Sequence, residues 1–237
     1  VPVTAIVSSI AILVALLNGH SAVAMSNERS AGQGSYLLDG VDVNHQFSKG
    51  FVAEQAIAVA VDELVGSIEY FSFLRPASEL AIARAFAGMT QYHHAFTSCN
   101  AVFRLDPARR ASNWCGDCPK CRFVWLILAP FIAPAKLTEI FGKDMYLDTS
   151  QFDGFAALVG VGEDKPFECV GTVDESIAAL RLTADRDEWA EHEMVARLLK
   201  SVGGEGAGDP ATAFALSGEH RVPRRFVAAL EAALDVA

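Results

Sequence analysis

The chain has 237 residues, with 19 Lys and Arg against 29 Asp and Glu, which gives a formal net charge of −10 at pH 7. This balance argues against a nucleic-acid-binding protein, because binding to a polyanion requires a basic surface that releases counterions. Hydrophobic residues make up 51% of the chain and charged residues 20%, a composition that excludes intrinsic disorder. We therefore expect a globular protein with one or two hydrophobic cores and no nucleic-acid partner.

The opening segment, residues 1–17, is apolar and carries no charge, which is typical of a targeting signal, a membrane span or a buried helix. A secretory signal requires a basic region before its apolar run, and polar residues interrupt this run too early for a membrane span. Pro2 near its start and Gly19 just after its end predict a buried α-helix. An apolar strand at 21–25 follows. A helix that leads into a buried strand is half of a βαβ unit, so we expect further strands before Val1 in a longer parent protein.

The remaining elements are expected to alternate between helix and strand up to about residue 90, after which the pattern is mainly helical. Together they predict an α/β fold with part of a parallel sheet in residues 1–90, a cysteine-rich segment in 91–135 and a helical region in 136–237. The individual elements are a loop or short hairpin at 31–50, a helix at 51–65, a strand at 68–73, a helix beginning at 76–79, apolar helices at 123–133, 135–141 and 152–161, and amphipathic helices at 177–182, 189–199 and 226–234.

A polar cluster, Ser26, Asn27 and Glu28, directly follows the first predicted strand. Open α/β sheets bind their ligands at the carboxyl ends of parallel strands, so this position indicates a ligand site. Asn27 and Glu28 suit a ribose or a Mg²⁺ ion that is also held by substrate phosphates. The same spacing is equally typical of a plain helix N-cap followed by a glutamate in the first turn.

A second polar cluster lies in the loop at residues 44–49. Asn44, His45, Gln46, Ser48 and Lys49 combine an imidazole, two amides, a hydroxyl and an ammonium group within six residues. This density of polar groups suits the capture of an anion or a carboxylate near a strand end. The alternative is a loop that is simply solvated.

Four of the five cysteines are concentrated between residues 99 and 121, as Cys99 followed by Cys115, Cys118 and Cys121. Gaps of two residues allow successive thiolates to face one ion, and a more distant cysteine completes a tetrahedral Cys₄ zinc site, which is our interpretation. The alternatives are an iron–sulfur cluster, although the sequence after Cys121 lacks the Cys-Pro continuation of ferredoxins, and a reduced thiol cluster without metal. Because protein atoms fill all four positions, we expect a structural rather than a catalytic metal.

The fifth cysteine, Cys169, lies beside Glu168 in the segment Lys165-Pro-Phe-Glu-Cys-Val-Gly171. A lone cysteine is more often a small buried hydrophobic residue than a reactive group. On residue type alone, either role is open for Cys169.

These segments together resemble the UDP-N-acetylmuramoyl-L-alanyl-L-glutamate epimerases, the MurL family, across nearly the whole chain up to about residue 185. More distantly, the chain is similar to the PP-loop ATP pyrophosphatase superfamily, whose queuosine-precursor synthases also have a cysteine followed by Cys-x₂-Cys-x₂-Cys after the last strands of the sheet. The stretches that carry the resemblance to the epimerases are 2–15, 26–31, 44–49, 73–79, 98–100, 114–121 and 165–171.

The resemblance implies a PP-loop (adenine nucleotide alpha hydrolase-like) domain and a cytoplasmic enzyme of peptidoglycan-precursor synthesis. In the implied reaction, ATP and Mg²⁺ support inversion of the terminal L-glutamate of the UDP-MurNAc-dipeptide to D-glutamate, through an acyl-adenylate, with release of AMP and pyrophosphate. The implied roles are proton transfer for His45, Glu168 and Cys169, nucleotide binding for Ser26, Asn27 and Glu28, and substrate binding for Asn44, Gln46, Ser48, Lys49, Arg75 and Lys165.

One departure from the superfamily concerns its Ser-Gly-Gly-x-Asp-Ser phosphate loop, which occurs nowhere between Val1 and Ala237. Backbone amides of such a loop are the main partners of the nucleotide phosphates. We therefore expect an additional N-terminal region in the parent protein, and little or no activity of this chain alone. Two alternatives stay open: another PP-loop ATP pyrophosphatase that forms an amide or a nitrile, and a zinc-stapled scaffold module without enzymatic activity.

Overall fold

The computed structural model describes residues 3–34, 36–162, 165–203 and 208–235. The chain divides into two compact units. Unit 1 contains the residues up to Ser78 together with Leu216–Asp235, and unit 2 contains Glu79–Ala215. This division differs from the predicted grouping of 136–237 as one helical region, because the last twenty or so residues belong to the first unit rather than the second.

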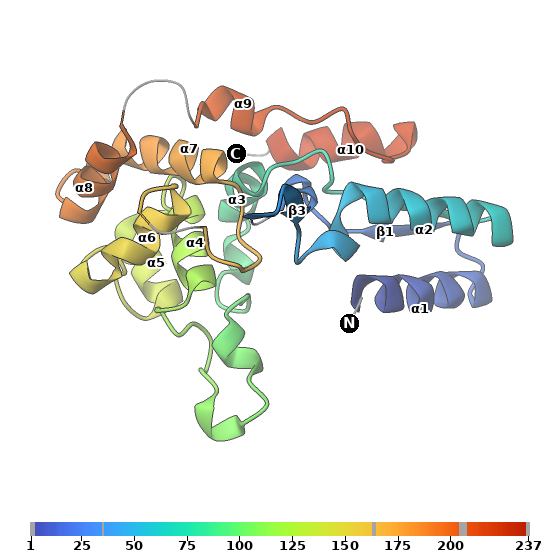
Figure 1. Cartoon of the computed structure of the whole chain (residues 1–237), viewed down its shortest axis with the longest axis horizontal. Coiled ribbons are helices and arrows are strands. Elements are labelled where there is room, and N and C mark those ends of the chain that lie inside the picture. Colours follow the sequence, from blue (N-terminus) through green and yellow to red (C-terminus); the bar gives the residue numbers. More distant parts are fainter. Residues whose placement is uncertain (1–2, 35, 163–164, 204–207, 236–237) are drawn as a thin grey trace. The chain divides into compact units, whose positions relative to one another are not determined.

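Unit 1 is an α/β unit, which agrees with the predicted fold class, and its sheet of two parallel strands is small. Strands β1 and β4 pair in parallel, with Ala22 opposite Glu69 and Met25 opposite Ser72. The predicted hairpin is confirmed as an antiparallel pair, β2 with β3. The elements are α1 (Val3–Leu17), β1 (Ala22–Met25), β2 (Tyr36–Leu38), β3 (Val41–Val43), α2 (Phe51–Leu64), β4 (Glu69–Ser72) and α10 (Arg224–Asp235) (Figure 1).

Helix α1 forms as predicted, but the expectation that its large apolar residues are buried is wrong for the described residues. Ile10 is 57% exposed and Leu17 74% exposed, whereas the buried positions are Thr4, Ser8 and Ala15. The small residues permit a close approach to the sheet, where Ser8 Oγ lies 2.6 Å from the hydroxyl of Tyr70 in β4. The buried cluster of unit 1 consists of Ala15, Val23, Ala58, Val61, Ile68 and Tyr70.

The C-terminal segment packs onto unit 1 through contacts that are far apart in sequence. The backbone N–H of Ser217 donates to the Pro76 carbonyl at 2.9 Å. Phe226 of α10 stacks on Phe71 of β4, with ring centroids 5.6 Å apart. Arg225 Nη1 donates to Glu69 Oε1 at 3.0 Å. These contacts place the predicted helix at 226–234 beside strand β4.

In the described residues of unit 2, all the regular elements are helices, joined by long irregular segments. The apolar and amphipathic helices predicted there are confirmed, whereas the short helix α9 was not predicted. Thr172 begins α7 with a capping box, in which its side chain accepts from the Glu175 N–H and the Glu175 carboxylate accepts from the Thr172 N–H. The helices are α3 (Glu79–Ala87), α4 (Pro119–Leu128), α5 (Pro134–Phe141), α6 (Phe152–Leu158), α7 (Val173–Ala184), α8 (Glu193–Val202) and α9 (Pro210–Phe214).

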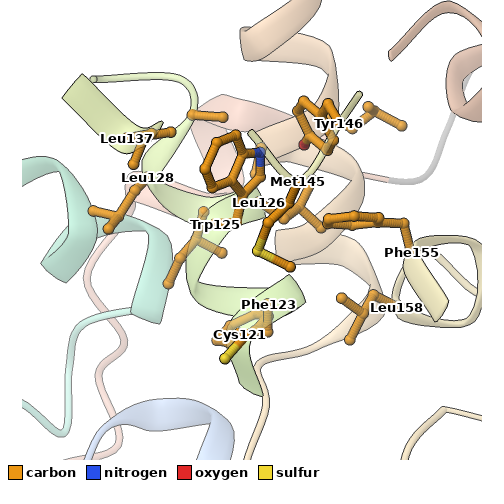
Figure 2. Close-up of a cluster of buried hydrophobic side chains, with 14 of the residues drawn as sticks. Cys121, Phe123, Trp125, Leu126, Leu128, Leu137, Met145, Tyr146, Phe155 and Leu158 are labelled. Carbon is orange, nitrogen blue, oxygen red and sulfur yellow. The ribbon is translucent and has the colours of Figure 1, made fainter. Parts of the chain in front are cut away.

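Helix α4 is the centre of the core of unit 2, because most of its residues are buried (Figure 2). Trp125 is fully buried and its ring meets Phe141 and Tyr146 edge to face, at centroid distances of 5.3 and 5.7 Å. Trp189 is also buried, and its indole N–H donates to the Ala129 carbonyl at 2.9 Å. This packing fixes the direction of α4, whose first turn carries Cys121. No helix among the described residues has the length and apolar character needed to cross a membrane.

Candidate functional site

A buried ion pair in unit 1 joins the segments that contain the predicted site residues. Arg75 and Glu54 are each 2% exposed, and Arg75 Nε donates to Glu54 Oε2 at 3.0 Å. The other carboxylate oxygen of Glu54 accepts from the backbone N–H of Ser72 at 3.0 Å. Arg75 Nη1 donates to the Glu28 carbonyl at 2.6 Å, and Nη2 donates to the Lys49 carbonyl. The ion pair thus fixes the end of β4 through Glu54, and the loop after β1 and the loop at 44–49 through Arg75.

Two hydrogen bonds of the Asn44 side chain give the loop at 44–49 a defined shape. The side-chain oxygen of Asn44 accepts from the Gln46 N–H at 2.7 Å, and its amide nitrogen donates to the Ala31 carbonyl at 2.9 Å. Gln46 is buried, and Lys49 Nζ lies 3.5 Å from its Oε1. Ser48 Oγ donates to Thr4 at 3.3 Å, whereas the side chain of His45 is exposed. The imidazole is therefore the accessible titratable group of this loop.

The residues after β1 form the second part of the site in unit 1. The side-chain amide of Asn27 donates to Ser72 Oγ at 3.1 Å, which links the ends of the two parallel strands. Ser26 is exposed and Glu28 is half-buried. A cavity of about 580 Å³ lies beside these loops, lined by Arg29, Gly32, Gln33, Asn44, Phe47, Gly50, Phe51, Val52, Arg75, Ser217 and Glu219.

This cavity has the mixed character of a small-molecule site. Phe47 and Phe51 offer apolar surface, and Arg29, Asn44 and Glu219 offer polar groups. It lies near the carboxyl ends of β1 and β4, where open α/β sheets bind ligands. Of the predicted site residues of unit 1, Asn44 and Arg75 line this cavity, whereas those at 26–28 and the other predicted residues of the loop at 44–49 are not part of its lining.

The predicted cysteine cluster is confirmed in unit 2. The ligand atoms of Cys99, Cys115, Cys118 and Cys121 all lie within 4.8 Å of one another, and no disulfide joins them. The Sγ–Sγ distances are 3.9 Å between Cys99 and Cys118, 3.7 Å between Cys115 and Cys121, and 3.5 Å between Cys118 and Cys121. Zn–S bonds of about 2.3 Å place tetrahedral sulfurs about 3.8 Å apart, so these distances fit one zinc ion.

The start of helix α4 stabilises the thiolate of this cluster. Cys118 is the N-cap of α4, and its Sγ accepts from the Cys121 N–H at 3.4 Å. The hydrogen bond between the Cys118 and Cys121 thiols, together with the bond from the Cys121 backbone N–H, lowers the pKa of Cys118 to about 5. The same hydrogen bond between the two thiols, together with burial, raises the pKa of Cys121. A thiolate is the form that binds a metal, so the local structure favours the first step of binding.

The remaining predicted residues, at 165–169, belong to unit 2. Asn100, which directly follows a cysteine of the cluster, donates from Nδ2 to Glu168 Oε2 at 2.8 Å. Cys169 and Lys165 are half-buried. Burial lowers the pKa of Lys165, against the opposing effect of Glu79 and Glu175. A lowered pKa brings a lysine closer to use as a proton acceptor near neutral pH.

Two features of unit 1 were missed from the sequence. Glu54 is the buried partner of Arg75, and the available signal was a lone carboxylate in the otherwise apolar first turns of the helix at 51–65. Ser217 and Glu219 line the cavity, and no local pattern marked them, because they reach it through long-range packing of the C-terminal segment.

The chain thus combines an α/β unit that carries a cavity of mixed polar and apolar lining with a helical unit that carries a four-cysteine cluster. Residues 1–73 match the family model of the MurL N-terminal domain, and residues 95–213 match that of the MurL C-terminal domain. The chain therefore belongs to the MurL family.

Curated relatives agree with this assignment. Proteins of Micromonospora sp. and Salinispora tropica, each named UDP-N-acetyl-alpha-D-muramoyl-L-alanyl-L-glutamate epimerase, are each 45% identical to the chain over 97% of its length. A protein of the same name from Xanthomonas oryzae pv. oryzae is 44% identical over 94%. The chain spans 52%, 50% and 50% of these relatives, or about half of their length. No solved structure matches the chain.

Proposed function

We propose that this chain is part of an enzyme that inverts the terminal L-glutamate of UDP-MurNAc-L-Ala-L-Glu to D-glutamate. The name shared by three relatives at 44–45% identity is the observation that carries the proposal. Because the chain spans about half of each relative, the proposal concerns a polypeptide of the relatives' length. The substrate belongs to peptidoglycan-precursor synthesis, for which we propose a cytoplasmic location.

The chemistry explains why such a reaction needs activation. The α-proton of a carboxylate is very weakly acidic, because the negative charge opposes formation of a carbanion. We propose that the glutamate carboxylate attacks the α-phosphorus of ATP, which forms an acyl-adenylate and releases pyrophosphate. The uncharged acyl group then accepts electron density when a base removes the α-proton. An acid returns a proton to the opposite face, and water releases AMP and the inverted product.

Three sets of residues are proposed for nucleotide binding, substrate binding and proton transfer. In unit 1, we propose that Ser26, Asn27 and Glu28 bind the nucleotide, with Asn27 and Glu28 near its Mg²⁺, which would offset phosphate charge. Asn44, Gln46, Ser48 and Lys49 are proposed for the substrate, together with Lys165 of unit 2. His45, Glu168 and Cys169 are proposed for proton transfer.

Arg75 was predicted as a direct partner of substrate anions. Its burial and its bonds to Glu54, Glu28 and Lys49 instead support a role in holding the two loops of unit 1. The PP-loop fold stays part of the proposal and is supported by a parallel strand pair with a cavity near its carboxyl ends.

The cysteine cluster is proposed as a structural zinc site. Four cysteines complete a tetrahedral shell, which leaves no position for a substrate or a water molecule. The zinc would connect the segment around Cys99 to the first turn of α4.

The test is incubation of the relatives'-length protein with ATP, Mg²⁺ and UDP-MurNAc-L-Ala-L-Glu in D₂O, followed by hydrolysis and chiral analysis of glutamate. We expect D-glutamate with deuterium at Cα only when ATP is present. Cys169→Ala and His45→Ala should each lower deuterium incorporation if these residues carry protons. His220→Ala, which alters a histidine outside the proposed roles, is the control.

Two other outcomes would contradict the proposed epimerase reaction. Unchanged L-glutamate with substrate-stimulated AMP release would support a different ATP pyrophosphatase, one that forms an amide or a nitrile. If neither D-glutamate nor AMP is produced, the proposed enzyme is refuted, and a zinc-stapled scaffold module becomes the better description.

A further inference from the structure

A short arm projects beside the cysteine cluster of unit 2. Residues 101–111 form this arm, and its ends are joined by the Ala111 N–H, which donates to the Ala101 carbonyl at 3.1 Å. Thr97 Oγ1 donates to the Asn113 carbonyl at 2.8 Å, so the base of the arm is also tied. Figure 1 shows this green segment extending away from the helices of unit 2. The arm thus starts from a fixed base next to Cys99.

Three arginines of the arm surround a hollow of about 460 Å³. Arg104, Arg109 and Arg110 line it together with Asp117 and Cys118. All three arginines are exposed, and none of them forms an ion pair with a carboxylate of the described residues. By contrast, the arginines at 75, 122, 186, 221 and 225 all have a carboxylate partner.

Backbone carbonyls hold two of these guanidinium groups in place without neutralising them. Arg110 donates from Nε to the Arg104 carbonyl at 2.6 Å and from Nη2 to the Leu105 carbonyl at 3.3 Å. Arg104 donates from Nη1 to the Arg109 carbonyl at 3.2 Å. Positioned guanidinium groups lose little side-chain freedom when an anion binds.

The carboxylates nearby already have other partners. Asp117 pairs with Arg122 at 2.8 Å, and Asp106 accepts from the Ala108 N–H at 3.0 Å. The arm therefore carries three arginines against one carboxylate, that of Asp106, in a chain whose net charge is −10. Such a concentration of fork-shaped donors matches phosphate oxygens better than a single carboxylate, which offers only two acceptors.

We propose that this hollow binds the diphosphate group of a nucleotide ligand. If the proposed function holds, that ligand is the UDP-linked substrate, whose diphosphate lies far from the glutamate that reacts. The arm would then anchor the substrate by its nucleotide end. Binding of a diphosphate by the arm does not require enzymatic activity, so it can be measured independently of the proposed reaction.

The experiment is calorimetric titration of the zinc-loaded 237-residue chain with UDP, inorganic pyrophosphate, ATP and uridine. We expect UDP and pyrophosphate to bind and uridine not to bind. Arg104→Ala with Arg109→Ala should weaken UDP binding at least tenfold per arginine, because each change removes charge-assisted hydrogen bonds. Arg110 is left intact because it donates two of the three side-chain hydrogen bonds to carbonyls of the arm, whereas Arg104 donates one. Stronger binding of ATP than of UDP would overturn the assignment to the substrate's diphosphate.

The matched control replaces two exposed cations away from the arm, Lys200→Ala with Arg224→Ala. It changes net charge by the same amount, so an equal loss of UDP binding in both double variants would show only general attraction and overturn the site. No UDP binding at millimolar concentration, or tighter binding of a single-stranded RNA than of UDP, would also overturn it. Circular dichroism and zinc content show whether the variants fold. Diphosphate binding by this chain, together with no epimerase activity of the relatives'-length protein, would refute the proposed function alone.

Discussion

The buried ion pair of unit 1 gives the sharpest prediction about stability. Replacing Arg75 by Met leaves the Glu54 carboxylate buried, with the hydrogen bond from the backbone N–H of Ser72 still in place. It also removes the donors to the carbonyls of Glu28 and Lys49. Methionine is flexible and apolar, so it fills much of the space without supplying any of these bonds.

The expected cost follows from the burial of the pair. The side chains of Arg75 and Glu54 are 3% and 1% exposed, so solvent screens their interaction only slightly. Removing one partner of a buried ion pair costs about 3–5 kcal/mol, because the other charge is left without compensation. We expect Arg75→Met to lower the stability of unit 1 by about 4 kcal/mol. The double variant with Glu54→Gln should recover part of this loss, since no buried charge is then unpaired.

Two separate measurements report the stability of the two units. All three tryptophans, Trp114, Trp125 and Trp189, lie in unit 2, so their fluorescence during urea unfolding reports that unit. Hydrogen exchange of the peptide containing β4 reports unit 1. Where exchange requires unfolding of unit 1, a loss of about 4 kcal/mol speeds it roughly 10³-fold, at about 1.4 kcal/mol per tenfold change.

The control for this variant is Lys136→Met, which breaks an exposed pair whose side chains are 43% and 67% exposed. Exposed pairs contribute about 0–1 kcal/mol, so this variant should change stability little. If exchange in β4 rises no more in Arg75→Met than in Lys136→Met, the reasoning about the buried pair is wrong.

Further predictions concern the metal site, a glycine and a surface carboxylate. The purified chain should carry one zinc per molecule by elemental analysis, and Cys118→Ser should reduce that content because it removes the thiolate favoured by α4. Gly208→Ala should destabilise unit 2 by more than about 2 kcal/mol in urea unfolding, because φ is +69° and the new Cβ meets backbone at 2.8 Å. Gly142→Ala, also at positive φ but with open space, should cost only about 1 kcal/mol. Hydrogen bonding, first from Ser150, lowers the pKa of Asp148 to about 2, so its stabilising effect is present above its usual pKa of 3.8 and is lost as pH falls through about 2. An NMR titration of Ser150→Ala should show the Asp148 pKa returning towards 3.8.

Local patterns in the sequence predicted the elements and the cysteine cluster well. Apolar strands bounded by glycine and proline identified β1 and β4, and the spacing of the cysteines identified a cluster whose sulfurs do lie together. The burial of α1 was predicted wrongly, because helical periodicity does not show which face packs. Here the small side chain of Ser8 allows a contact with Tyr70 that a larger residue prevents.

Local sequence patterns could not predict contacts between segments that are distant in the chain. The pairing of Arg221 with Asp62 at 3.3 Å joins residues far apart in the chain, and nothing in the local sequence of either residue specifies the other. The same holds for Ser217 and Glu219 at the cavity. The positions of these residues depend on the packing of the C-terminal segment against unit 1. This packing is set by the folded core of the unit and not by the local sequence.

Arg75 shows how such assembly changes the interpretation of a residue. An arginine after a strand end suits a phosphate, and the sequence offers no reason to choose between binding and support. In the structure each of its three nitrogens has a protein partner, two of which are carbonyls of the loops at 26–28 and 44–49. Because one rigid planar group holds both loops, a shift of Arg75 must move the residues proposed for the nucleotide and those proposed for the substrate together. The geometry of the proposed site in unit 1 therefore depends on the burial of Glu54, a residue with no proposed contact to either ligand.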